Sequence, residues 1–166
     1  MKKLATRTAQ SDLVAEFVFN FNDWVVDSVS GSKLTFGSTA ITSVDPTEPG
    51  LIAGTGVTFD CVPMPAGAVI VGGSVIVETA FVGIGAGATL NVGVAGNITA
   101  YMAALDLDAA TAGSRTALSL ATPLASNNGQ NIRLTTAGIV ATATAGRVRI
   151  RVVYSIDGRA TEAIGN

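Results

Sequence analysis

The sequence predicts an all-β fold: an antiparallel, jelly-roll-like β-sandwich with an extended N-terminal arm. Apolar residues recur at every second position in many short segments, which is typical of strands. Turn signals separate these segments at intervals of about 8–12 residues, as in β-sandwiches. No stretch carries a helical stripe of useful length, and parallel sheets need crossover helices, so we expect antiparallel sheets.

The first residues predict the arm. Residues 1–12 are polar, mixed in charge and without periodicity, so we expect them to be disordered alone or laid along a partner. Residues 13–166 are expected to form a single β-sandwich domain, since a chain of 166 residues can bury one real core. The two lysines at the start are not followed by the apolar stretch of a secretion signal, so none is expected.

The strands before residue 63 are short. Alternation begins at Leu13 and gives one face the aromatic residues Phe17, Phe19 and Phe21. Trp24 follows a turn, and we expect its burial in the core or in a subunit interface more than stacking on a ligand. Further strands are expected at 39–44 and 57–62, separated by the loop signal "DPTEPG".

The longest strand candidate spans residues 68–82. Both of its parities are apolar, which predicts a central strand covered on both faces, and Gly72-Gly73 predicts a bulge or bend. Residues 79–105 form a charge-free run of 27, long enough to suggest a membrane span. Its glycines, asparagines and alternation predict strands instead, so no membrane partner is expected.

The remaining strands are predicted from the same alternation. Between them, residues 106–114 fit one short helix or a long loop, and the sequence leaves both open. The strands are expected at 88–94, 97–102, 115–121, 131–138, 139–146 and 147–155.

The composition bounds the function. Charged residues make up 13% of the chain, against about 25% in ordinary soluble domains, which favours contact with protein inside an assembly. The net charge of −2 provides no general attraction for nucleic acid. The absence of histidine excludes Ser-His-Asp and Cys-His catalysis and histidine-ligated zinc. The single cysteine, Cys61, excludes an intrachain disulfide and is expected to be a buried hydrophobe.

Two motifs resemble ligand sites without meeting their requirements. "GIGAGA" at 83–88 matches a loose dinucleotide fingerprint, but a strand follows it where that motif needs a helix. Asp106 and Asp108 begin like a calcium loop, yet Thr111 and Ala117 stand where an EF-hand needs glycine and an acid. We expect solvated carboxylates there, with a calcium site of another kind left open. No cofactor, metal or enzymatic activity is predicted.

Charged residues inside strands form the clearest pattern. Arg147, Arg149 and Arg151 share one parity, opposite to the apolar residues of the same segment. This stripe predicts a solvated outer face, a stripe paired with acids on a neighbouring strand, or a charge-assisted subunit contact. Nucleic acid fits it least, because no aromatic residues are interleaved with the arginines. Glu16 and Glu78 lie within strand patterns, and we expect ion pairs with strand arginines more than a hydrolytic carboxylate pair.

Three segments carry a resemblance to a known class of protein: "PAGAVIVGGSVIVETAF", "TLNVGVAGN" and "AYMAALDL", within residues 62–108. They resemble β-sandwich structural proteins of tailed bacteriophages, especially head decoration or cement proteins. The resemblance covers under a third of the chain. It implies a non-enzymatic subunit, commonly a trimer, that binds the major capsid protein shell where capsomers meet. It also implies synthesis in the host cytoplasm and a final location on the virion surface.

The contact residues are our own candidates from charge and periodicity. We expect Lys2, Lys3 and Arg7 of the arm to contact the shell, although a basic arm also serves as a solubilising tail. The candidate subunit interface comprises Arg147, Arg149, Arg151 and Trp24. The alternative function is a receptor- or glycan-binding module of a phage tail or fibre, for which one tryptophan and two tyrosines are a thin aromatic inventory.

Overall fold

The computed structural model describes residues 12–28, 31, 33–35, 57–120 and 129–156. All regular elements in this part of the chain are strands: β1 (Leu13–Asn20), β2 (Trp24–Val26), β3 (Lys33–Thr35), β4 (Thr58–Val62), β5 (Ala68–Val82), β6 (Thr89–Val94), β7 (Asn97–Asp106), β8 (Arg115–Ala117), β9 (Ile132–Ala137) and β10 (Ala145–Ile156).

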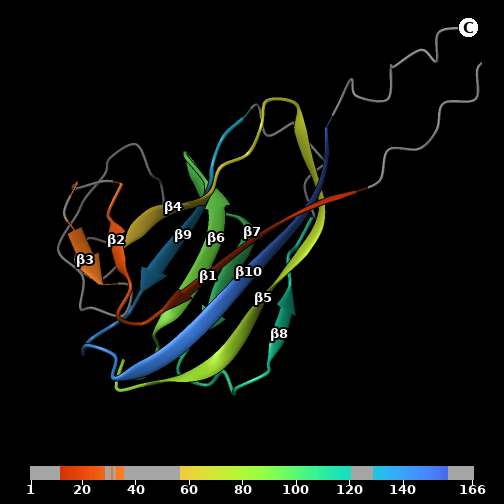
Figure 1. The fold of residues 1–166 in the computed structure, drawn as a ribbon. Coiled ribbons are helices and arrows are strands. Elements are labelled where there is room, and N and C mark those ends of the chain that lie inside the picture. Colours follow the sequence, from red (N-terminus) through yellow and green to blue (C-terminus); the bar gives the residue numbers. More distant parts are fainter. Residues whose placement is uncertain (1–11, 29–30, 32, 36–56, 121–128, 157–166) are drawn as a thin grey trace, which may run out of the picture.

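The strands form two four-stranded sheets and a separate hairpin. One sheet has the order β1-β10-β5-β8, the other has the order β4-β9-β6-β7, and β2 pairs with β3. All pairs are antiparallel. In Figure 1 the sheet with β1, β10 and β5 lies nearer to the viewer and the other sheet lies behind it. The all-β antiparallel sandwich is therefore confirmed, whereas the jelly-roll connectivity stays a prediction.

The core lies between the sheets, where alternate residues of each strand are buried. On β10, Val148, Ile150 and Val152 are fully buried. The rings of Phe19 on β1 and Phe59 on β4 meet edge to face, 5.6 Å between centroids, and so join the two sheets. Burying each such side chain stabilises the fold by about 1.5–3 kcal/mol.

The bulge predicted in the longest strand is present and changes which parity is buried. Along β10, the partner on β5 changes from Gly72 to Ile70 between two successive residues, so β5 carries one extra residue there. Ile70 is buried before this point and Val75 and Val77 after it. A Cβ on Gly73 would collide with the carbonyl oxygen of Arg151, which explains the glycine.

The expectation that residues 68–82 are covered on both faces holds only in part. The strand is central in its sheet, between β10 and β8. Both parities are buried over residues 68–70, and again at Ser74 and Val75. Beyond the bulge, Ile76 and Glu78 point outward and are only partly buried.

Two other segments differ from or complete the expectations. Residues 139–144 were expected to form a strand but run as a loop, although Ile139 and Ala143 are buried. Residues 106–114 contain no helix; they form a loop anchored by the buried Leu107, whose N–H donates to the Ala88 carbonyl at 2.8 Å.

The charge-free run of residues 79–105 forms the end of β5, then β6 and most of β7. Within the described ranges, no helix has the length and apolar character needed to cross a membrane. Residues 1–11 of the arm expected at 1–12, and the strand expected at 39–44, lie outside the described residues.

Candidate functional site

The arginine stripe lies on the outer side of the first sheet. Arg147, Arg149 and Arg151 alternate along β10 with the buried residues of the core face. Their direct partners on β1 are Asn20, Val18 and Glu16. The stripe therefore sits in the middle of a four-stranded surface, with β1 on one side and β5 on the other.

Two glutamates bind this stripe, as the sequence predicted. Arg149 donates from Nε to Glu78 Oε1 at 2.6 Å and from Nη1 to Glu16 Oε2 at 3.3 Å. Arg147 Nε lies 2.7 Å from Glu78 Oε2, and Arg151 Nε lies 3.6 Å from Glu16 Oε1. The hydrogen bond from Arg149 to Glu78, the negative charge of Glu78 and the weaker contribution of Glu16 raise the pKa of Arg149. Each glutamate is thus tied to arginines and does not face the other across a cleft.

A fourth arginine, Arg115, belongs to the same surface and was not singled out from the sequence. It pairs with Ile76, which in turn pairs with Arg149, so these three side chains share the outer face. Arg115 is exposed, and no ion pair joins it to any described residue. We call the outward side chains Glu16, Glu78, Arg115, Arg147, Arg149 and Arg151 the arginine face.

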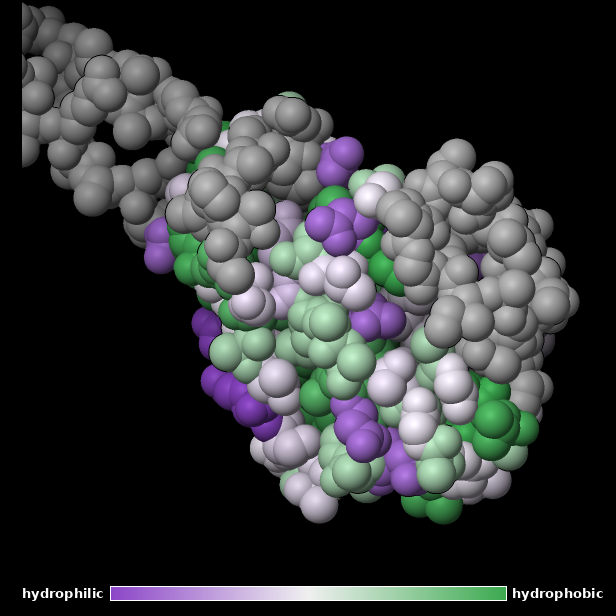
Figure 2. Space-filling model, turned by 180° about the vertical axis from the view of Figure 1, so that it is seen from behind, coloured by the Kyte–Doolittle hydropathy of each residue, from purple (hydrophilic) through white to green (hydrophobic). Residues whose placement is uncertain are grey.

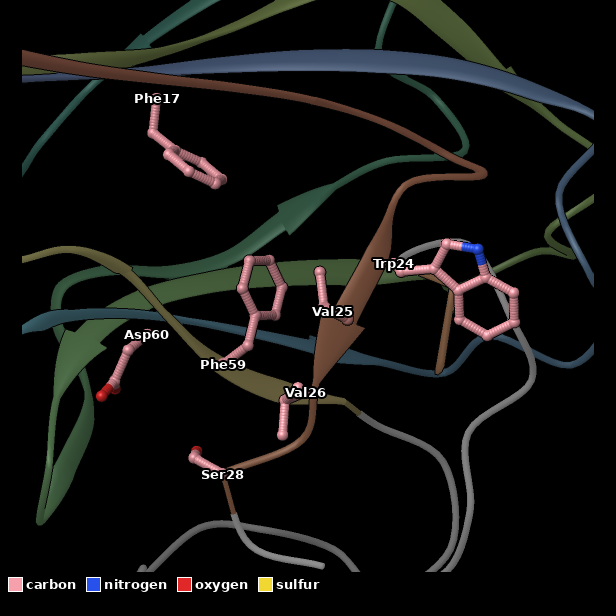
Figure 3. A pocket seen from close by; sticks show the side chains of 7 residues that line it. All are labelled: Phe17, Trp24, Val25, Val26, Ser28, Phe59 and Asp60. Atoms are coloured by element: carbon pink, nitrogen blue, oxygen red, sulfur yellow. The ribbon is translucent and has the colours of Figure 1, made fainter. Parts of the chain in front are cut away.

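A second surface is an open apolar depression of about 400 Å³ between the edge strands β1 and β4 and the strand β2. Figure 3 shows Phe17, Phe59 and Val25 converging from these three strands. We call this depression the apolar seam; its lining is Phe17, Trp24, Val25, Val26, Ser28, Phe59 and Asp60.

The seam exposes apolar side chains that would normally be buried in the core. Trp24 is 64% exposed and Val26 is 59% exposed, while Phe17 is 37% exposed. The ammonium of Lys33 lies 5.1 Å from the centre of the Trp24 ring, a cation–π contact. Of the two kinds of burial expected for Trp24, burial in the core does not occur, because β2 lies outside both large sheets. Its burial in a subunit interface stays a prediction.

The opposite side of the molecule carries little charge. Figure 2 views it from the side of the second sheet, where the described surface is mostly white to pale green with scattered purple residues. Among the residues of β6 and β7, only Asp106 is charged. An ion pair joins β4 and β9 of the second sheet, in which Arg133 Nε lies 2.8 Å from Asp60 Oδ1.

Other residues weighed from the sequence have structural roles. The segment 83–88 joins β5 to β6, and Ile84 within it is fully buried. Asp106 and Asp108 are exposed, and no group of three potential metal ligands occurs in the described ranges. Cys61 is buried and donates to the Ile132 carbonyl at 3.2 Å; burial raises the pKa of its thiol. The arm candidates Lys2, Lys3 and Arg7 lie outside the described residues.

Comparison with known proteins gives one informative likeness. No family model and no curated protein matches the chain. The solved structure of the cyanophage Pam1 capsid asymmetric unit contains a chain that is similar, with a TM-score of 0.60 and 20% sequence identity. The match covers 93% of this chain and 94% of that chain, so the likeness extends over the whole fold and not over a shared fragment.

Proposed function

We propose that the protein is a structural virion protein that binds and stabilises a bacteriophage capsid shell as a decoration or cement protein. The observation that carries this proposal is the fold shared, over nearly the full length of both chains, with a chain of a cyanophage capsid asymmetric unit. In this role the protein stabilises the particle by mass action, because it binds the assembled shell and not its free subunits.

We further propose that it acts as a trimer placed between capsomers. The low charge and the exposed seam support burial of protein surface on assembly, since Trp24, Val26 and Phe17 are exposed apolar side chains that line one depression. Tryptophan and arginine are also the residues that most often dominate binding at interfaces. Trp24 and the arginines of β10 are therefore assigned to contacts between copies.

The shell contact is assigned to the basic arm residues Lys2, Lys3 and Arg7. The protein performs no catalysis in this role and needs no cofactor, and it resides on the capsid surface after synthesis in the host cytoplasm. Its partners are the major capsid protein shell and further copies of itself, with neither nucleic acid nor membrane involved.

Co-sedimentation with shells of the major capsid protein encoded in the same genome tests this function. The full chain should sediment with the shells, and a variant lacking residues 1–12 should sediment much less. Within the seam, Val26→Asp should reduce the solution mass of the oligomer. Val140→Asp is the matched control, because Val140 is also an exposed valine but does not line the seam. A full chain that stays in the supernatant at all shell concentrations contradicts the proposal.

The alternative function, a receptor- or glycan-binding module of a phage tail or fibre, gains support from one observation. The exposed indole of Trp24 at the margin of an open depression offers a surface for stacking a sugar ring. Deletion of residues 1–12 separates the two functions, because it should weaken shell binding and leave glycan binding almost unchanged.

A further inference from the structure

The arginine face carries more positive than negative charge. Its four arginines stand against two glutamates, an excess of two positive charges on one side of the sandwich. The whole chain has a net charge of −2. The rest of the chain therefore holds an excess of negative charge.

The glutamates of the face do not satisfy all of its cations. Arg149 takes the closest contacts of both carboxylates, at 2.6 Å to Glu78 and 3.3 Å to Glu16. Arg151 shares Glu16 at 3.6 Å, and its Nε is a buried atom without a hydrogen-bond partner among the described residues. Arg115 is exposed and has no ion pair within the described ranges. Arg115 is therefore the guanidinium of the face that is open to a carboxylate from a second copy.

Carboxylates without a cation occur on an adjacent side of the same molecule. Asp106 and Asp108 are exposed and form no ion pair in the part of the chain that the structure describes; Asp106 only accepts the Ala109 N–H at 2.9 Å. Their loop leaves the second sheet and reaches the first, where the Gly113 N–H donates to the Val77 carbonyl at 2.7 Å. The loop therefore runs along the β7–β8 side of the sandwich, beside the arginine face and not opposite to it.

We propose that the arginine face binds the Asp106–Asp108 loop of a second copy of this chain, in a head-to-tail contact. Arg115 receives an aspartate of the loop, while Glu16 and Glu78 hold the arginines of β10 in place as positioning residues. Contact of the face with itself would bring two positive surfaces together, which opposes a two-fold dimer. A polyanion such as nucleic acid fits less well, because the two glutamates within the face repel phosphates.

The geometry of the two patches suits a closed ring. A head-to-tail contact forms a ring when the rotation between copies closes and an open filament when it does not. Patches on opposite sides of a subunit favour a filament, whereas the arginine face and the aspartate loop occupy adjacent sides, as a small ring requires. This inference deepens the trimer of the proposed function by naming its contact, and it uses the purified chain alone, so failure to bind a shell leaves it standing.

The test is the solution mass of the full chain and of two charge-reversal variants, measured by light scattering on a sizing column. Arg115→Glu and Asp108→Arg each place like charges in every contact, and each should raise the dissociation constant by about tenfold or more. Mixing the two variants should restore association in part. In a mixed trimer one contact joins the introduced glutamate to the introduced arginine, one keeps the original pair, and one still holds like charges. No chain in that mixture carries both changes, so recovery cannot come from a contact within one chain, and it also shows that both variants are folded.

Three outcomes overturn the proposal. The first is a wild-type chain that stays monomeric at the highest concentration tested. The second is an unchanged oligomer mass for either single variant. The third is a mixture of the variants that associates no better than each variant alone. Raising the salt concentration should weaken the wild-type oligomer, since charges at a partly exposed contact are screened.

Discussion

Removing the charge of Glu78 should destabilise the protein more than removing the charge of a carboxylate outside the arginine face. In Glu78→Gln the side chain keeps its shape but loses its charge. Glu78 contacts Arg149 at 2.6 Å and Arg147 at 2.7 Å, and its side chain is 24% exposed. The variant leaves Glu16 as the one carboxylate of the face against its arginines.

The magnitude follows from the number and exposure of these contacts. An exposed ion pair contributes about 0.2–1 kcal/mol, and Glu78 makes two of them. Arg147 and Arg149 are 46% and 34% exposed, so solvent screening keeps each contribution within that range. We expect a loss of about 0.4–2 kcal/mol in the free energy of unfolding at low salt, or about 1–8 °C in Tm.

Urea denaturation followed by circular dichroism, at low and at high salt, measures this loss. The control is Asp12→Asn, which removes the same charge from an exposed residue with no ion pair in the described ranges and should change stability by less than about 0.5 kcal/mol. The effect of Glu78→Gln should shrink at high salt, because the contacts are partly exposed. Equal effects of the two substitutions, or no dependence on salt, would refute the reasoning.

Three further predictions concern the fold. Gly146→Ala should lower the free energy of unfolding by about 2 kcal/mol or more, because φ is +146° and the new methyl group would meet the Phe81 ring. Gly96→Ala, with φ +78° and open space around the position, should lower it by about 1 kcal/mol. Equal losses in urea denaturation would contradict this. Ala104→Gly should raise stability by about 0.5–1 kcal/mol, since Ala104 has φ 50°, and a lower Tm would count against it. The thiol of Cys61 has a raised pKa in the folded protein and ionises near 9.0 when exposed, so the free energy of unfolding should fall by about 1.4 kcal/mol per pH unit above that pH. The fall should be smaller in Cys61→Ala. Parallel curves of stability against pH for the two proteins would show that the thiol contributes nothing.

Alternation in the sequence was sufficient to predict the sandwich and to assign the residues of β10 to its two faces. A strand of twelve residues has one pattern, and that pattern separates Arg149 from Ile150 without knowledge of the neighbours. It also placed Glu16 and Glu78 in strands, from which their ion pairs with arginines were expected. Which glutamate reaches which arginine depends on register, and register is a property of the folded sheet.

Short strands and bulges limited how much of the remaining structure could be predicted from the sequence. The bulge near Gly72 switches the buried parity of β5, and a pattern that changes phase reads as two apolar faces. Arg115 lies in a strand of three residues, too short for its own alternation to assign a face. Its place on the arginine face follows only from its pairing with Ile76.

Trp24 is the clearest case in which the alternation pattern does not predict how exposed a side chain is. In β2, Val25 is buried and both of its neighbours are exposed, so the alternation itself is regular. An alternating sequence normally directs its larger apolar residue inward, yet here the tryptophan points outward and the smaller valine inward. Exposed apolar patches on a subunit often mark a surface that contacts protein or a ligand. The arginine face shows a similar imbalance in charge, because the exposed Arg115 has no ion pair among the described residues. Both surfaces therefore carry features that the proposed contacts between copies would bury.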